Sequence, residues 1–247
     1  MADALIRKIT LEVCVDSAHG LAAALDGGAD RIELCGALDV GGLTPSSGLL
    51  RLAASSPVPV VAMIRPRGGD FCFDDAEIEL MLHEIDAVAA AGLQGVVLGA
   101  SLPDGQLDWP TLQRLVRRAT DQGLRCTLHR AIDLCPDLAD ATRQAIDLGF
   151  ERILTSGGAK SAPDGIANLA RCIDAAAGRI AIMPGAGIDA VNVGLLRAQL
   201  ALTDIHASCS TPLPVPAEKI TALGFDSGNR RRTSSSKVAA LKAALLA

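Results

Sequence analysis

A pattern that repeats along the whole chain constrains its fold more than any other feature of the sequence. A segment of helical character ends in glycine, and a short apolar or β-branched run begins at once, as in residues 28–34 and 149–154. Glycine is favoured just past a helix C-terminus because it adopts the left-handed conformation at little cost. The pattern therefore predicts alternating helices and strands. Strands are expected at residues 11–15, 28–34, 58–64, 95–98, 123–128, 149–154, 178–182 and 203–207.

Eight strand–helix units in 247 residues favour one fold class, a (β/α)8 TIM barrel that spans 1–247 as a single domain. A doubly wound open sheet is the alternative. Helices are expected to begin near Asp74, which forms a capping pattern with Glu77, and near Asp108. Segment 211–247 is predicted to be a loop followed by a final helix.

The composition fits buried parallel strands and argues against a nucleic-acid partner. Apolar residues make up 49% of the chain, but aromatic residues only 2%. Few rings are therefore available to stack on bases, and a net charge of −5 repels a phosphate backbone. The three arginines at 230–232 are interpreted as a solvated helix start.

The sequence also predicts where the protein works. No apolar stretch is long and uncharged enough to span a bilayer, so no membrane partner is expected. The N-terminus lacks the apolar region of a secretion signal. Seven cysteines, an odd number scattered along the chain, do not resemble a disulfide framework. We expect a cytoplasmic protein with reduced thiols.

Ionisable side chains lie near the ends of five predicted strands. Side chains two residues apart share one face of a strand, and TIM barrels carry function at the C-terminal ends of their strands. Each of these residues alone could be a satisfied core residue or part of a charged surface turn. Together they predict a functional site, with members Glu12, Cys14, Asp16, Glu33, Cys35, Arg65, Arg67, Thr127, His129, Asp133, Asp204, His206 and Ser208.

Eight short motifs resemble the CutC family, the copper homeostasis protein family. They occur in order at residues 11–17, 28–35, 41–46, 65–71, 128–133, 154–157, 183–188 and 205–208. The resemblance implies a TIM barrel, a cytoplasmic location, a homo-oligomer and copper handling. The chain departs from the family at Ala186, where a third glycine is usual, and at Cys72 and Phe73.

The thiols suggest a copper site. Cys14 and Cys35 are expected at equivalent heights on neighbouring strands, where two thiolates would bridge a soft ion such as Cu(I). Cys72 is the expected third donor. Zn²⁺ is disfavoured because no paired Cys-x₂-Cys spacing occurs. The alternative is that these cysteines are buried as small apolar residues.

A second hypothesis is an enzyme, a lyase or isomerase that acts on a small anionic substrate, including phosphorylated ones. Acid–base groups would come from the strand ends, and arginines would hold the anion with help from the glycine turn after the seventh strand. The candidate acid–base residues are His129, Glu12, Glu33, Asp133 and His206. The candidate substrate-binding residues are Arg65, Arg67, Ser156, Gly185, Gly187 and Ser208.

Overall fold

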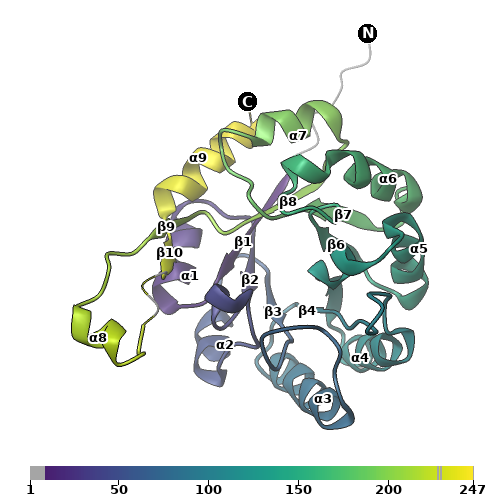
Figure 1. Cartoon of the computed structure of the whole chain (residues 1–247), viewed down its shortest axis with the longest axis horizontal. Helices are drawn as coiled ribbons and strands as arrows, with labels where there is room; N and C mark the ends of the chain where they lie inside the picture. Colours follow the sequence, from purple (N-terminus) through teal and green to yellow (C-terminus); the bar gives the residue numbers. More distant parts are fainter. Residues whose placement is uncertain (1–8, 227, 229, 247) are drawn as a thin grey trace.

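The centre of the molecule is a nearly closed barrel of eight parallel strands (Figure 1). The computed structural model describes residues 9–226, 228 and 230–246. Hydrogen-bonded neighbours follow the order β7-β6-β5-β4-β3-β2-β1-β8. The predicted TIM barrel is confirmed, and the doubly wound sheet is excluded. The strands are β1 (Thr10–Val15), β2 (Arg31–Leu34), β3 (Val60–Met63), β4 (Gly95–Leu98), β5 (Arg125–Leu128), β6 (Arg152–Thr155), β7 (Ala181–Pro184) and β8 (Asp204–Ala207).

Helices surround the barrel (Figure 1). The capping box predicted at Asp74 and Glu77 is present, and the Asp108 side chain accepts from the Thr111 N–H. None of the described helices combines the length and apolar character needed to cross a membrane. The helices are α1 (Ala18–Asp26), α2 (Ser47–Ala53), α3 (Asp75–Ala90), α4 (Trp109–Asp121), α5 (Leu138–Leu148), α6 (Ile166–Ala176), α7 (Val193–Gln199), α8 (Glu218–Ala222) and α9 (Ser235–Leu246), with short 3₁₀ helices η1 (Leu38–Val40), η2 (Arg130–Leu134) and η3 (Pro163–Gly165).

The strands divide their side chains between two environments. On β1, Leu11, Val13 and Val15 belong to the large apolar core that the strands share with the surrounding helices. Glu12 and Cys14 alternate with them, and they therefore point into the barrel. This alternation places ionisable side chains inside the barrel while the apolar ones hold the helices.

One layer of the barrel interior is charged. Arg31 lies between two carboxylates, with Nε 2.5 Å from Glu12 Oε2 and Nη2 2.6 Å from Asp204 Oδ1. Arg152 adds a second cation, with Nε 3.2 Å from Asp204 Oδ1 and Nη1 donating to Thr127 Oγ1. We call Glu12, Arg31, Thr127, Arg152 and Asp204 the interior charge layer. Its two positive and two negative groups are paired with each other.

The C-terminal segment is more ordered than the sequence predicted. Strand β9 (Ser210–Pro212) pairs in antiparallel fashion with β10 (Arg231–Thr233). The arginine run therefore forms a strand rather than the helix start expected for it, because it has a partner strand at the end of β8. Between β9 and β10 the chain carries α8 away from the ring of helices (Figure 1). The final helix is confirmed as α9.

Candidate functional site

A cavity of about 1120 Å³ opens at the C-terminal ends of the strands. We call it the mouth. Residues that follow β1, β2, β3, β5, β7 and β8 line it, and the β9–β10 hairpin covers one side. Of the residues predicted for the site, seven line the mouth: Cys14, Glu33, Arg65, His129, Gly187, His206 and Ser208.

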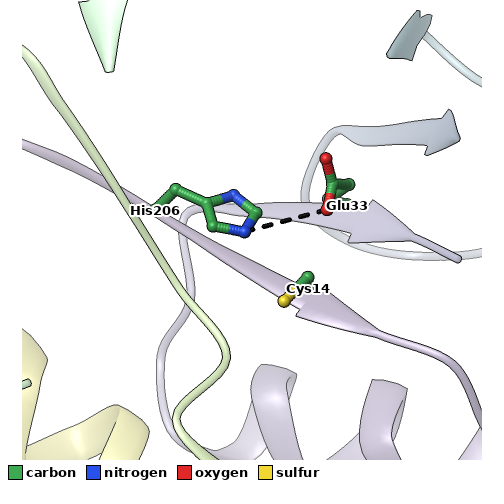
Figure 2. A group of neighbouring side chains, drawn as sticks. All are labelled: Cys14, Glu33 and His206. Carbon is green, nitrogen blue, oxygen red and sulfur yellow. Dashed lines mark ion pairs between the residues drawn. The ribbon is translucent and has the colours of Figure 1, made fainter. Parts of the chain in front are cut away.

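Three of these side chains form a compact buried cluster (Figure 2). One ligand atom from each of Cys14, Glu33 and His206 lies within 4.8 Å of the others. The residues come from three adjacent strands, β1, β2 and β8. In the β1–β2 register Cys14 is opposite Glu33, not Cys35, which corrects the expectation that the two thiols lie at equivalent heights. The strands of a barrel are staggered, and the sequence does not reveal this offset. The cluster, named here the thiol–imidazole cluster, therefore combines one thiol, one imidazole and one carboxylate.

Glu12 fixes the orientation of the His206 ring. His206 Nδ1 lies 2.8 Å from Glu12 Oε1, and Nε2 lies 3.7 Å from Glu33 Oε2. Burial alone would lower the pKa of His206, but Glu33, Cys14 and Glu12 raise it well above its ordinary value. Burial alone would raise the pKa of Glu12, but the hydrogen bond to His206 and the charge of Arg31 lower it to about 2. Glu12 thus belongs to the interior charge layer and supports the cluster from below.

The other two predicted thiol ligands lie outside this cluster. Cys35 is fully buried and donates from Sγ to Glu33 Oε2 at 3.5 Å. Burial, together with Glu33 and Cys14, raises the pKa of Cys35 well above its ordinary value. Cys72 is half-buried on the loop after β3, with Sγ 4.0 Å from Ser101 Oγ. The structure brings Cys35 next to the cluster but does not bring Cys72 to it.

Arg65 follows β3, the strand next to β2, and is held by backbone carbonyls. Its Nη1 donates to the carbonyls of Val40 and Gly42, and its Nη2 donates to that of Gly69. The guanidinium carbon lies 4.9 Å from the centroid of the Phe71 ring. Burial and the charge of Arg67 lower the pKa of Arg65. Its Nε has no hydrogen-bond partner among the described residues.

His129 packs against the same Phe71 ring, with ring centroids 4.8 Å apart. Its Nδ1 accepts a hydrogen bond from the backbone N–H of Ala131. Burial and the charge of Arg65 lower the pKa of His129 to about 3, so the ring is neutral at physiological pH. The ring fits only because residue 99 is glycine, since a Cβ there would lie 2.5 Å from the imidazole. His129 is therefore a neutral N–H donor rather than a base poised near pH 7.

Arg67 does not share the mouth with Arg65. Its Nε lies 2.5 Å from Glu77 Oε1 at the start of α3, and its Nη1 lies 3.0 Å from Asp70 Oδ1. The two arginines were expected on one face because they are two residues apart. That rule requires an extended strand, and β3 ends at Met63. Arg67 is thus paired within its own loop.

Asp133 and Ser156 form a closed hydrogen-bond network beside the mouth. Asp133 accepts from Thr155 Oγ1 at 2.5 Å, from Ser156 Oγ at 3.0 Å and from Arg130 Nε at 2.7 Å. Further bonds from backbone N–H groups, including that of Gly158, leave its oxygens fully engaged. In the structure these two residues tie η2 to the loop after β6.

The glycine turn after β7 reaches the mouth through Ala186 and Gly187. Gly185 packs closely instead, because a Cβ there would lie 2.4 Å from Leu154 Cδ1. Ala186 has φ 76°, a conformation that favours glycine. The role predicted for this turn in holding an anion stays a prediction.

Sequence reasoning missed two members of the interior charge layer, Arg31 and Arg152. A usable signal existed for both. Arg31 has the same strand parity as Glu33, and Arg152 has the same parity as Leu154, which lines the mouth. Side chains two residues apart on a strand share one face. Counting back two residues from Glu33 and from Leu154 would therefore have placed both arginines inside the barrel.

These observations define a class: a (β/α)8 barrel with a buried thiol, imidazole and carboxylate at the C-terminal ends of its strands. The sequence profile described as the CutC family matches residues 9–211. The chain belongs to the CutC family. A relative from Rhizobium meliloti, named family protein CutC, is 55% identical over 238 residues, which are 96% of each chain. A relative of the same name from Caulobacter vibrioides (strain NA1000 / CB15N) is 48% identical and covers 97% of this chain and 98% of its own.

Solved structures agree with this assignment. The crystal structure of a protein from Streptococcus agalactiae, provisionally named copper homeostasis protein CutC, is 30% identical with a TM-score of 0.76. The match covers 81% of this chain and 98% of that one. Tryptophan synthase subunit alpha from Legionella pneumophila matches with a TM-score of 0.59 at 14% identity, over 97% of this chain and 93% of that one. At that identity the likeness shows the barrel fold alone.

Proposed function

We propose that this protein binds copper as Cu(I) at the thiol–imidazole cluster and takes part in copper homeostasis. The observation that carries the proposal is the convergence of Cys14, Glu33 and His206 within 4.8 Å in a buried site open to the mouth. The name of the Streptococcus agalactiae relative points to the same role.

The donor types suit a soft ion. A thiolate and an imidazole are ligands that Cu(I) accepts, and it tolerates low coordination numbers. Cys14 would supply the thiolate and His206 Nε2 the nitrogen. Glu33 completes the set from the neighbouring strand. Cys35 does not belong to the cluster, but its Sγ donates a hydrogen bond to Glu33 Oε2, so it contacts one of the proposed ligands.

The support behind His206 favours a metal site as well. Ligating histidines usually donate their other ring N–H to a carboxylate, which fixes the tautomer and turns the free nitrogen to the ion. Glu12 holds Nδ1 at 2.8 Å, and Nε2 faces Glu33 and Cys14 (Figure 2). Imidazole and thiol groups bind a metal in their deprotonated forms, so affinity would fall at acid pH.

Titration against a Cu(I)-selective chelator under anaerobic, reducing conditions tests the proposal. We expect Cys14→Ser and His206→Gln each to weaken Cu(I) binding by about a hundredfold or more, since each removes a ligand. Cys135→Ser is the matched control, because Cys135 is a half-buried thiol at the same end of the barrel that does not line the mouth.

Cys72→Ser tests the third donor expected from the sequence. Because Cys72 lies against Ser101, away from the cluster, we expect binding within about threefold of the wild type. Folded Cys14→Ser and His206→Gln variants that hold Cu(I) as tightly as the wild type would rule out the cluster as the copper site.

An acid–base enzyme acting on a small anion at the mouth is the second candidate. The favouring observation is the size of the cavity, about 1120 Å³, which far exceeds the room an ion needs and matches a small-molecule site. Its lining includes cationic side chains such as Arg65 and Arg231. The reaction would be of the lyase or isomerase type, with Glu33 or His206 as the proton carrier. Turnover of a panel of small acids and sugar phosphates by the metal-free protein tests it.

The cellular setting is part of the proposal. All seven cysteines are free in the structure, which suits the reducing cytoplasm. We propose a cytoplasmic homo-oligomer in which each chain is one barrel domain. Sedimentation velocity on the purified full chain, with reducing agent present, measures the oligomeric state, and a monomer at all concentrations would refute it.

A further inference from the structure

We propose that Arg65 and His129 form a second ligand site in the mouth, one that binds the carboxylate group of a small organic acid. The site uses different atoms from the copper cluster and goes beyond the copper proposal. It also deepens the enzyme alternative by naming a substrate class, and any turnover of the bound acid would rest on that alternative.

Arg65 is a buried cation that lacks a counter-charge. Its side chain is almost enclosed, with the residue only 5% exposed. Its three contacts through Nη1 and Nη2 are all neutral carbonyls, and no carboxylate of the described residues forms an ion pair with it. An unpaired buried charge costs several kcal/mol. A bound anion would supply the missing partner.

Two unpaired N–H groups lie at this point of the mouth. Arg65 Nε and His129 Nε2 are buried atoms without a hydrogen-bond partner among the described residues, and both residues contribute to the lining of the cavity. Because His129 Nδ1 accepts from the Ala131 N–H, the ring proton must be on Nε2. Both unpaired atoms are therefore donors. A ligand that satisfies them must present acceptors.

The Phe71 ring contacts both side chains that carry these donors. The Arg65 guanidinium packs over this ring at 4.9 Å, and the His129 ring packs against it at 4.8 Å. Backbone carbonyls lock the guanidinium, and the Ala131 N–H locks the imidazole. Neither side chain can turn away to find another partner without losing these contacts. The pair is pre-organised for a ligand.

The number of donors and the charge select a carboxylate. One N–H from each residue matches the two oxygens of a carboxylate, and the single charge of Arg65 balances its single negative charge. A phosphate dianion would bring a third oxygen and a second charge to the same two donors. Arg67 offers no help, because Glu77 and Asp70 already engage it.

The test uses metal-free full-length protein, kept so with a copper chelator and a reductant. Acetate, lactate and pyruvate are titrated against sodium chloride at equal ionic strength, with the melting temperature and calorimetric affinity as readouts. We expect the carboxylates to stabilise the wild type. Arg65→Gln should weaken their binding roughly tenfold or more, since it removes a charge-assisted hydrogen bond.

Two further variants keep the test decisive if Arg65→Gln folds poorly. His129→Asn preserves an acceptor for the Ala131 N–H but deletes the Nε2 donor, and we expect about threefold to tenfold weaker binding. Arg67→Gln removes the same charge from the neighbouring loop and should bind as the wild type does. Cu(I) affinity should stay unchanged in Arg65→Gln, so this proposal and the copper proposal fail separately.

Three results would overturn the carboxylate site. One is a wild-type protein that no carboxylate stabilises beyond the chloride control. Another is equal weakening in Arg67→Gln and in His129→Asn, which would mean a general charge effect. The third is binding of inorganic phosphate, but of no carboxylate, with dependence on Arg65.

Discussion

The interior charge layer and the mouth lie one above the other on the same strands, yet they differ in how completely their polar groups are paired. Below, Arg31 bridges Glu12 and Asp204, and Arg152 pairs with Asp204 as well. Above, Glu33 Oε1, Arg65 Nε and His129 Nε2 have no partner among the described residues, although all three side chains are buried.

This difference in pairing distinguishes structural residues from functional ones more clearly than the residue types do. Both regions contain acids and bases, and both are enclosed. A buried network whose polar groups are all paired needs no ligand to be stable. Unpaired buried polar groups destabilise the ligand-free protein, and a bound ligand would supply their missing partners. We therefore expect substitutions in the layer to affect stability and substitutions in the mouth to affect binding.

The largest expected effect comes from breaking the interior charge layer. Arg31→Met would leave Glu12 and Asp204 buried without their shared cation, and we expect a loss of about 3–5 kcal/mol in the free energy of unfolding. Urea denaturation measures it. Arg125→Met is the matched control, because the Arg125–Glu151 pair is exposed at 3.8 Å and should contribute under about 1 kcal/mol. Equal losses in both variants would contradict the comparison.

A smaller effect should appear as a pH dependence in the mouth. The pKa of His129 is lowered to about 3 in the folded chain and is about 6.5 in the unfolded chain. Between these values the unfolded state binds more protons, so acidification through this window destabilises the fold by up to about 1.4 kcal/mol per pH unit. The stability difference between wild type and His129→Asn should therefore shift in favour of the variant from pH 6.5 to 5.

Urea midpoints at several pH values measure this difference directly, and comparing the two proteins cancels the contributions of the other ionisable groups. His83→Asn, at an exposed histidine on α3, controls for the substitution itself. A difference that does not change with pH would show that folding does not lower the pKa of His129, and it would contradict the role of Nδ1 as a fixed acceptor for the Ala131 N–H.

Glu33→Gln should change stability by about 1 kcal/mol or less, because one carboxylate oxygen is already unpaired and a neutral amide is less costly to bury. Copper affinity, in contrast, should fall measurably, since a ligand is lost. Urea denaturation and Cu(I) titration of the same preparation separate the two effects. A stability loss as large as that of Arg31→Met would place Glu33 with the structural layer.

The smallest effect is expected at Arg67. Its ion pairs with Glu77 and Asp70 are partly exposed, and such pairs contribute roughly 0–1 kcal/mol. Arg67→Gln should lower the melting temperature only slightly and leave ligand binding intact. A large loss of ligand binding would show that Arg67 takes part in the site, as the sequence had predicted.

The barrel could be predicted because each strand follows a local signal. Glycine after a helix marks the start of most strands, and the caps at Asp74 and Asp108 mark the starts of two helices. These signals involve residues that are close in the sequence. Strand β10 was missed because its pairing with β9 joins residues about twenty positions apart, across a segment without periodicity.

The sequence predicted which residues lie at the candidate site, but not which of them contact each other. Strand parity correctly brought Cys14, Glu33, Arg65, His129 and His206 to one end of the barrel. Which atoms are paired depends on strand register and on loop paths, which the sequence does not encode locally. The pairing of Cys14 with Glu33 depends on strand register, and the ion pair of Arg67 with Glu77 depends on the path of a loop.

The arginines of the β9–β10 hairpin have a kinetic consequence. Arg230, Arg231 and Arg232 line the rim of the mouth, although the chain as a whole has a net charge of −5. The local field at the entrance thus opposes that of the rest of the surface. It speeds the encounter with anions and slows a bare cation, and added salt weakens both effects. Copper would therefore enter fastest as a negatively charged complex, at a rate that declines as ionic strength rises.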